Sequence, residues 1–159
     1  MSSDKKIIDE INKFLVRKEN FALALVLETW NSAPKPVGSI LAVSEKGEIA
    51  GSVSGGCVES AVITEAKITL ETKKNKILTF GVTNEAAFQV GLACGGEIKI
   101  LIEPITLANK STRKLFVRFF KNYFNRDLSI FKICLSSSQK ELIENKEALK
   151  ALTTKKNYQ

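Results

Sequence analysis

The chain has 159 residues, 44% of them hydrophobic and 26% charged, a composition that suits one globular domain and excludes a disordered chain or two full domains. It contains no histidine, which excludes Ser-His-Asp and Cys-His nucleophile arrangements and every zinc site that needs a histidine ligand. The net charge of +7 comes from the last third: residues 1–104 hold 12 basic and 13 acidic residues, whereas residues 105–159 hold 12 and 4.

The first elements along the chain are a helix and a central strand. Residues 4–18 carry apolar side chains at helical spacing, which predicts an amphipathic helix. FALALVLETW, residues 21–30, is a continuous apolar run, typical of a strand covered on both faces. NSAPKPVGS then holds two prolines, which predict a shaped loop.

The middle of the chain predicts a hairpin, helices and further strands. Residues 39–53 have the pattern of a β-hairpin, and residues 57–73 that of a helix. A strand at 75–81, a short helix at 83–93 and a strand at 97–105 follow.

The last third predicts a helix at 111–125, a strand at 128–135 that contains Cys134, and a lysine-rich helix at about 139–152. The expected fold is therefore α/β: a single domain with a mixed β-sheet and helices packed on it. Residues 105–159 form a basic α/β extension of the domain that ends at residue 104.

Two cysteines lie beside Gly-Gly pairs. SVSGGCVES places Cys57 at the start of a predicted helix, and GLACGGE places Cys94 before a second pair. Glycine allows close approach of the backbone to a ligand, and N–H groups at a helix start favour an anion. The pattern therefore indicates phosphate binding beside a reactive or metal-binding sulfur. A small cysteine in a plain turn is the alternative that spacing alone leaves open.

Charged side chains near these loops add candidates. Lys35 lies between two prolines in APKPVG, where a rigid loop presents it to an anion, and Glu59 follows Cys57 by two positions. A solvated surface charge is the competing interpretation for each. The odd number of cysteines, in a chain without a visible signal peptide or a membrane-length apolar run, is typical of free thiols in a cytoplasmic protein.

Three stretches together carry a family resemblance. ALVLETWNSAPKPVGS, GSVSGGCVES and VGLACGGEIKILIEPI, in this order, resemble the N-terminal domain of the XdhC/CoxI family, the accessory proteins of xanthine dehydrogenase and aerobic carbon monoxide dehydrogenase. The resemblance covers residues 18–104. It implies a protein without turnover of its own that binds molybdenum cofactor (molybdopterin) transiently, helps it acquire its terminal sulfur and delivers it to a molybdenum hydroxylase apoenzyme.

The resemblance also implies site residues. No catalytic residue is expected, and the family's motifs fall on these predicted cofactor-binding residues: Ser54, Gly55, Gly56, Cys57, Glu59, Cys94, Gly95, Gly96 and Lys35. Cys57 and Cys94 are the expected contacts of the metal or its sulfur. Lys35 stands where the family usually has arginine and Asn31 where glycine is common, so the forked, bidentate contact of arginine with phosphate is lost.

Two other functions remain open from the sequence. Cys57 is a candidate for a persulfide-carrying nucleophile in a sulfur-transfer enzyme served by a cysteine desulfurase. The basic segment at 113–126 is the only candidate for nucleic-acid binding, and no known RNA-binding motif accompanies it. No Rossmann glycine motif follows residue 105, so a separate Rossmann-domain partner is an expected interaction, and a homodimer is a further one.

Overall fold

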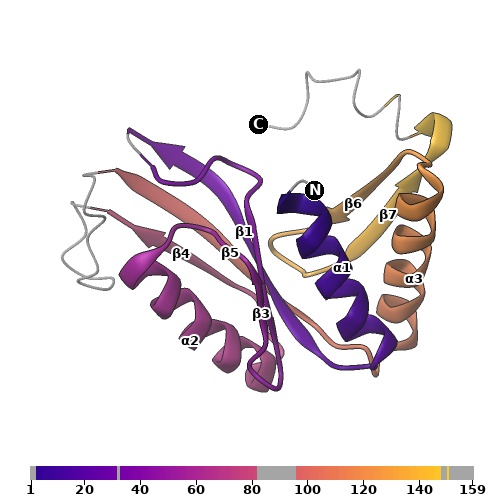
Figure 1. The fold of residues 1–159 in the computed structure, drawn as a ribbon, viewed down its shortest axis with the longest axis horizontal. Helices are drawn as coiled ribbons and strands as arrows, with labels where there is room; N and C mark the ends of the chain where they lie inside the picture. Colours follow the sequence, from indigo (N-terminus) through magenta and orange to yellow (C-terminus); the bar gives the residue numbers. More distant parts are fainter. Residues whose placement is uncertain (1–2, 32, 82–95, 148–149, 151–159) are drawn as a thin grey trace. The chain divides into compact units, whose positions relative to one another are not determined.

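The computed structural model describes residues 3–31, 33–81, 96–147 and 150. The chain divides into two compact units, Met1–Thr106 and Leu107–Gln159, which are considered one at a time (Figure 1). This division lies close to the boundary expected after residue 104. Compact units do not by themselves decide whether the two parts fold together, so the expectation of one domain stays a prediction.

A five-stranded sheet forms the centre of the first unit, in the order β3-β2-β1-β5-β4. β1, the predicted buried strand, lies in the middle and pairs with β2 on one side and β5 on the other. The strands are β1 (Phe21–Trp30), β2 (Ile40–Ser44), β3 (Ile49–Gly51), β4 (Lys76–Phe80) and β5 (Glu97–Ile105). β2 and β3 form the predicted hairpin.

The sheet confirms the α/β class with helices packed on the sheet, but its strand directions differ from the expected mixture. All four pairings within it are antiparallel. The crossover from β3 through α2 (Gly56–Thr72) to β4 does preserve the strand direction, as such connections usually do. β1, β3 and β4 run in one direction and β2 and β5 in the other, and the two directions alternate across the sheet, so no parallel pair forms.

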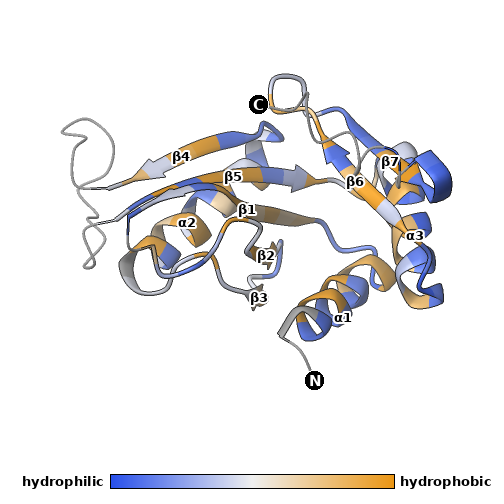
Figure 2. Cartoon of the chain, turned by 90° about the horizontal axis from the view of Figure 1, so that it is seen from above, coloured by the Kyte–Doolittle hydropathy of each residue, from blue (hydrophilic) through white to orange (hydrophobic). Residues whose placement is uncertain are grey.

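The main hydrophobic core lies between α2 and one face of the sheet. Val58, Val62 and Ala66 project from α2 at helical spacing and are buried in one cluster with residues of β1 and β5. Figure 2 shows the apolar residues along these strands and on α2. Burial of each large aliphatic side chain contributes about 1.5–3 kcal/mol to the free energy of folding. This packing holds α2, and with it the loop before α2, in a fixed place on the sheet.

The other helix of this unit, α1 (Ser3–Val16), is the predicted amphipathic helix. Its apolar stripe buries Ile11, Phe14 and Leu15, and the Phe14 ring lies 5.9 Å from that of Phe21 in β1. The helix packs mainly along the β2–β3 hairpin and contacts the central strand at its first residue.

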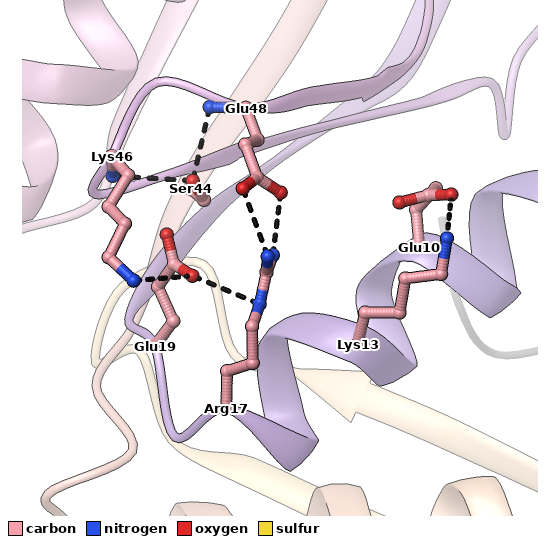
Figure 3. A network of polar contacts seen from close by, with 7 residues as sticks. All are labelled: Glu10, Lys13, Arg17, Glu19, Ser44, Lys46 and Glu48. Atoms are coloured by element: carbon pink, nitrogen blue, oxygen red, sulfur yellow. Dashed lines mark hydrogen bonds and ion pairs between the residues drawn. The ribbon is translucent and has the colours of Figure 1, made fainter.

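A group of charges joins the end of α1 to the β2–β3 turn (Figure 3). Arg17 donates through both terminal nitrogens to Glu48, at 3.0 and 2.6 Å. Its Nε lies 3.3 Å from the carboxylate of Glu19, and Lys46 Nζ approaches the same oxygen at 3.5 Å. The Glu19 side chain is almost fully buried, so these two cations compensate a charge that water does not reach.

The second unit consists of α3 (Lys110–Asn125) and a two-stranded antiparallel sheet of β6 (Ser129–Ile133) and β7 (Lys140–Glu144). Asn109 caps the helix by accepting hydrogen bonds from the backbone N–H groups of Ser111 and Thr112. Phe116 and Phe119 of α3 pack on Phe131 of β6, with ring centroids 4.7 and 5.9 Å apart. These contacts confirm the predicted helix at 111–125.

Two expectations for the last third are wrong. Residues 140–144 form β7 and not the first turns of a helix, because Leu142 and Ile143 pair with Phe131 and Ile130 across the hairpin. Cys134 follows β6 instead of lying within a strand, and it is exposed. The predicted short helix at 83–93 lies outside the described residues. Within the described ranges, no helix has the length and apolar character needed to cross a membrane.

Candidate functional site

Two of the predicted motifs lie at the same end of the five-stranded sheet, the end at which β1 finishes. β1 ends at Trp30, where β5 begins at Glu97, and β2 begins at Ile40, which pairs with Leu25 of β1. β3 finishes at the same end of the sheet, because its last residue, Gly51, pairs with Leu41 near the start of β2. The proline loop before β2, the loop that follows β3 and the start of α2 therefore share one end of the sheet (Figure 1).

A pocket of about 440 Å³ opens between α1, the proline loop with the start of β2, and the end of β3. α1 and the start of β2 supply its apolar side chains, and the proline loop and the end of β3 supply most of its polar groups. Its lining residues are Lys6, Ile7, Ile8, Lys35, Gly38, Ser39, Ile40, Gly51 and Ser52. The structure thus places the predicted residue Lys35 in one pocket with Ser52, which opens the Gly-Gly-Cys loop.

The backbone holds the walls of this pocket in place. Gly38 adopts a φ of 88° and donates from its N–H to the carbonyl of Val26, while the Ser39 hydroxyl donates to the carbonyl of Pro36 at 2.7 Å. Gly51 has a φ of 89°, and a Cβ there would lie 2.2 Å from the backbone oxygen of Ile40. A side chain at Gly51 would therefore separate β3 from β2 and deform the pocket.

Glu59 holds the Gly-Gly-Cys loop. Its Oε2 accepts hydrogen bonds from the backbone N–H groups of Val53, Ser54 and Gly55 at 3.3, 3.2 and 2.8 Å, and from the Ser52 hydroxyl at 3.1 Å. The N–H groups that the sequence suggests for an anion thus converge on a carboxylate of the same chain. This arrangement is close to a capping box, in which an acidic side chain in the first turn accepts from the residue that caps the helix.

Ser54 has a buried hydroxyl. The residue is 8% exposed, and its Oγ has no hydrogen-bond partner among the described residues. A buried hydroxyl without a partner costs about 1–3 kcal/mol, a cost that a ligand atom within reach would remove. Ser54 is therefore a polar group available beside the loop.

The two glycines before Cys57 are needed for their backbone angles. Gly55 caps α2 with a φ of 102°, and Gly56 begins the helix with a φ of 59°. A Cβ at either position would meet no described atom within 4 Å, and both residues are exposed. The backbone is thus open to a ligand directly before Cys57, the second residue of α2.

The second predicted wall of the site is described only in part. Cys94 and Gly95 lie outside the described residues, so a site shared by Cys57 and Cys94 stays a prediction. Gly96 is buried and directly precedes β5, at the same edge of the sheet as the proline loop. In the part of the chain that the structure describes, no three Cys, Asp or Glu side chains are placed to hold a metal ion.

Sequence reasoning missed one thiol. Cys134 is exposed, its Sγ lies 3.3 Å from the Ser136 hydroxyl, and hydrogen bonds from Ser136 and Ser137 lower its pKa to about 6. The run of serines after Cys134 was the available signal, since hydroxyl and N–H donors in a turn stabilise a thiolate. This thiol belongs to the second unit of the chain.

Comparison with known proteins agrees with the motifs. Residues 15–81 match the model of the XdhC and CoxI family. The chain is 30% identical over 94 residues to the molybdenum cofactor insertion chaperone PaoD of Escherichia coli (strain K12), which covers 59% of this chain and 29% of the relative. It is 32% identical over 82 residues to the protein YqeB of the same organism, covering 52% of this chain and 15% of YqeB.

A solved structure shows the same fold. It is described as a xanthine dehydrogenase from Bacillus halodurans, and it matches with a TM-score of 0.68 at 19% identity over 88% of this chain and 43% of its own. The chain thus spans less than a third of the two curated relatives and under half of this structure. Residues 15–81, which contain the proline loop and the Gly-Gly-Cys loop, are the segment of the chain that is similar to the XdhC and CoxI family.

Proposed function

We propose that the protein binds molybdenum cofactor as cargo and assists its insertion into the apoenzyme of a molybdenum hydroxylase. One observation carries this proposal: the proline loop and the Gly-Gly-Cys loop meet at one edge of the sheet, in the segment that matches the XdhC and CoxI family. The relative PaoD, named as an insertion chaperone for this cofactor, supports the same role.

The described residues suit the chemistry of this cargo. Molybdenum cofactor combines an anionic phosphate, a planar pterin and a metal with sulfur ligands, so a site for it needs cations, open backbone and a soft sulfur. Lys35 supplies a cation in the pocket, and the exposed Gly55 and Gly56 leave the backbone open to the cargo. Cys57 follows at the start of α2 and supplies the thiol.

The residues then have distinct roles in the proposal. Cys57, together with Cys94, contacts the metal or its sulfur, and Gly55, Gly56, Gly95 and Gly96 allow close approach. Ser54 offers its buried hydroxyl to the cargo. Glu59 acts through the loop that it holds, because its Oε2 already accepts four hydrogen bonds.

Cofactor retention tests the proposal. The full chain is mixed with molybdenum cofactor and passed through a gel-filtration column, and the cofactor in the protein fraction is measured by the fluorescence of its oxidised pterin. We expect the native chain to retain cofactor and the Cys57→Ser variant to lose at least about 80% of it, because a hydroxyl is a poor ligand for a soft metal.

The Cys134→Ser variant is the matched control, since it removes an exposed thiol from the other unit and should retain as much cofactor as the native chain. Equal retention of cofactor by all three proteins would contradict the proposal that Cys57 contacts the cofactor. Absence of retention by the native chain would refute the cofactor-binding role itself.

The alternatives gain no specific support from the described residues. The nucleic-acid hypothesis relies on cations of α3, but Arg118 is paired with Glu144 of β7 and Asn122 donates to the same carboxylate at 2.6 Å. A persulfide on Cys57 stays a prediction that mass spectrometry after incubation with a cysteine desulfurase would test.

A further inference from the structure

We infer that the 440 Å³ pocket between the start of α1 and the proline loop is a phosphate-monoester site whose cationic groups are Lys6 and Lys35. Lys6 lies outside the motifs of the family match, which begins at residue 15. The identification of the natural ligand as the phosphate end of the cofactor rests on the proposed function, whereas the pocket's preference for phosphate does not.

The N–H groups of Val53, Ser54 and Gly55 in the Gly-Gly-Cys loop are not the main phosphate donors, because Glu59 already accepts from all three. Glu59 Oε2 accepts from three successive N–H groups of the loop and from the Ser52 hydroxyl. A phosphate in the same position would have to expel this carboxylate and would then lie beside a like charge. The anion of a ligand is therefore expected to bind where the chain leaves cations without a competing carboxylate.

The pocket provides those cations. Its charged lining residues among those the structure describes are Lys6 and Lys35, and none of its described lining residues is acidic. The hydroxyls of Ser39 and Ser52 donate to other groups, to the Pro36 carbonyl and to Glu59. Lys6 and Lys35 are therefore the lining residues that we assign to the anion. Two lysines about one pocket attract a doubly charged phosphate more strongly than a carboxylate.

The surroundings confine the anion to this end of α1. A neighbouring pocket of about 730 Å³ continues along α1 and β3 and shares Lys6 with the first. Its lining also contains Asp9 and Glu10, which repel an anion, and Glu10 pairs with Lys13 at 2.5 Å. A phosphate is thus attracted to the end of the pocket that holds Lys35.

The size and the apolar lining define the rest of the ligand. A volume of about 440 Å³ exceeds what a phosphate group fills and lies within the range of small-molecule sites, about 300–1,000 Å³. Ile7, Ile8 and Ile40 line the pocket beside the two lysines. The ligand class is therefore a phosphate monoester attached to a small, partly apolar organic group.

Lysine labelling of the full chain with pyridoxal 5′-phosphate tests the pocket without molybdenum cofactor. This probe is a phosphate monoester on a planar ring, and its aldehyde condenses with a lysine amine; borohydride then reduces the imine to a stable amine that peptide mass spectrometry locates. We expect Lys6 and Lys35 to be labelled at least tenfold faster than by pyridoxal, which lacks the phosphate. Inorganic phosphate in excess should remove this preference.

Lys67 and Lys74, which are exposed in the same unit, serve as internal references. Pyridoxal closes to an internal hemiacetal and labels every lysine more slowly, so the tenfold preference at Lys6 and Lys35 is measured relative to the preference at these two lysines. If all exposed lysines respond alike, or if inorganic phosphate protects none of them, the pocket is not a phosphate site.

Cofactor retention by two double variants tests the identity of the ligand. Lys6→Ala/Lys35→Ala should retain less than a fifth of the cofactor that the native chain holds. Lys67→Ala/Lys74→Ala, which removes the same charge from the same unit, should retain most of it. Selective labelling combined with full retention by Lys6→Ala/Lys35→Ala would refute the cofactor phosphate as the ligand, while selective labelling by a native chain that holds no cofactor would support the pocket and refute the proposed function.

Discussion

Glu59 shows how one side chain determines the shape of the Gly-Gly-Cys loop. Its carboxylate accepts hydrogen bonds from Ser52, Val53, Ser54 and Gly55, so it orders the backbone directly before Cys57. The sequence places Glu59 beside the predicted site but does not reveal this role, because its acceptor contacts depend on how the loop turns back over α2. The carboxylate takes the place that an anionic ligand was expected to fill.

Replacement of Glu59 by alanine should destabilise the first unit. The substitution leaves three backbone N–H groups without their acceptor, which should reduce the free energy of unfolding by about 2 kcal/mol. Urea denaturation measures the change. The control is Glu71→Ala on the exposed side of the same helix, which should stay within about 0.5 kcal/mol of the native chain. Equal losses from both substitutions would contradict the role of Glu59 in ordering the loop.

Cys134 should react as a thiolate at neutral pH. Because hydrogen bonds from Ser136 and Ser137 lower its pKa to about 6, the thiolate fraction rises as the pH passes 6 and is nearly complete at pH 7, whereas an ordinary thiol ionises near pH 8.5. The rate of alkylation by iodoacetamide, resolved by peptide mass spectrometry, should therefore level off above about pH 7.

Ser136→Ala should move this midpoint to higher pH, and Ser129→Ala, a serine of β6 in the same unit, should leave it in place. A rate that keeps rising between pH 8 and 9 in the native chain would show that the thiol is not stabilised as proposed.

At the scale of elements, α1 is joined to the β2–β3 turn by charges as well as by apolar packing. Arg17 bridges Glu48, an exposed partner, and the buried Glu19 (Figure 3). The guanidinium lowers the pKa of Glu48, so the Glu48 contribution to stability is present above the ordinary carboxyl pKa and is lost as the pH falls through the lowered value. A buried carboxylate that depends on a neighbouring cation is sensitive to the loss of that cation.

Removal of Arg17 should be partly reversed by a second substitution. Arg17→Ala leaves Glu19 buried with Lys46 as its remaining cation, at 3.5 Å, and should lower the thermal unfolding midpoint. Adding Glu19→Gln removes the poorly compensated charge and should recover about half of that loss. Calorimetry measures the unfolding midpoints of the single and the double variant. A double variant with a lower midpoint than Arg17→Ala would refute the idea that the uncompensated charge of Glu19 causes the loss.

Lys13→Ala is the control on the same helix. It removes the exposed ion pair with Glu10, and exposed pairs contribute little to stability, so the midpoint should hardly change.

At the scale of the whole molecule, the two units of the chain differ in net charge. The first unit carries almost no net charge, and the basic excess lies in residues 105–159. Within that basic part, pairing of Arg118 with Glu144 and of Lys132 with Glu141 uses acidic residues of β7. A count of charges along the sequence therefore overstates the cations that α3 presents for a partner.

Most helices and strands followed from local patterns. The apolar stripe of α1, the continuous apolar run of β1 and the turn between β2 and β3 each predict their element, because the repeat of buried positions is set by the backbone geometry of that element. β7 was misread because KELIENKEAL has the composition of a helix, and its strand conformation depends on pairing with β6.

The sequence by itself determined the similarity of residues 15–81 to the XdhC and CoxI family, the glycine positions and the absence of histidine chemistry, since these depend on residue types and their spacing. Only the tertiary structure decided that the sheet is antiparallel, that Glu59 occupies the N–H groups of the loop and that Lys6 shares a pocket with Lys35. The physical reason is that these features depend on contacts between segments that are distant in the sequence. The sheet brings those segments together.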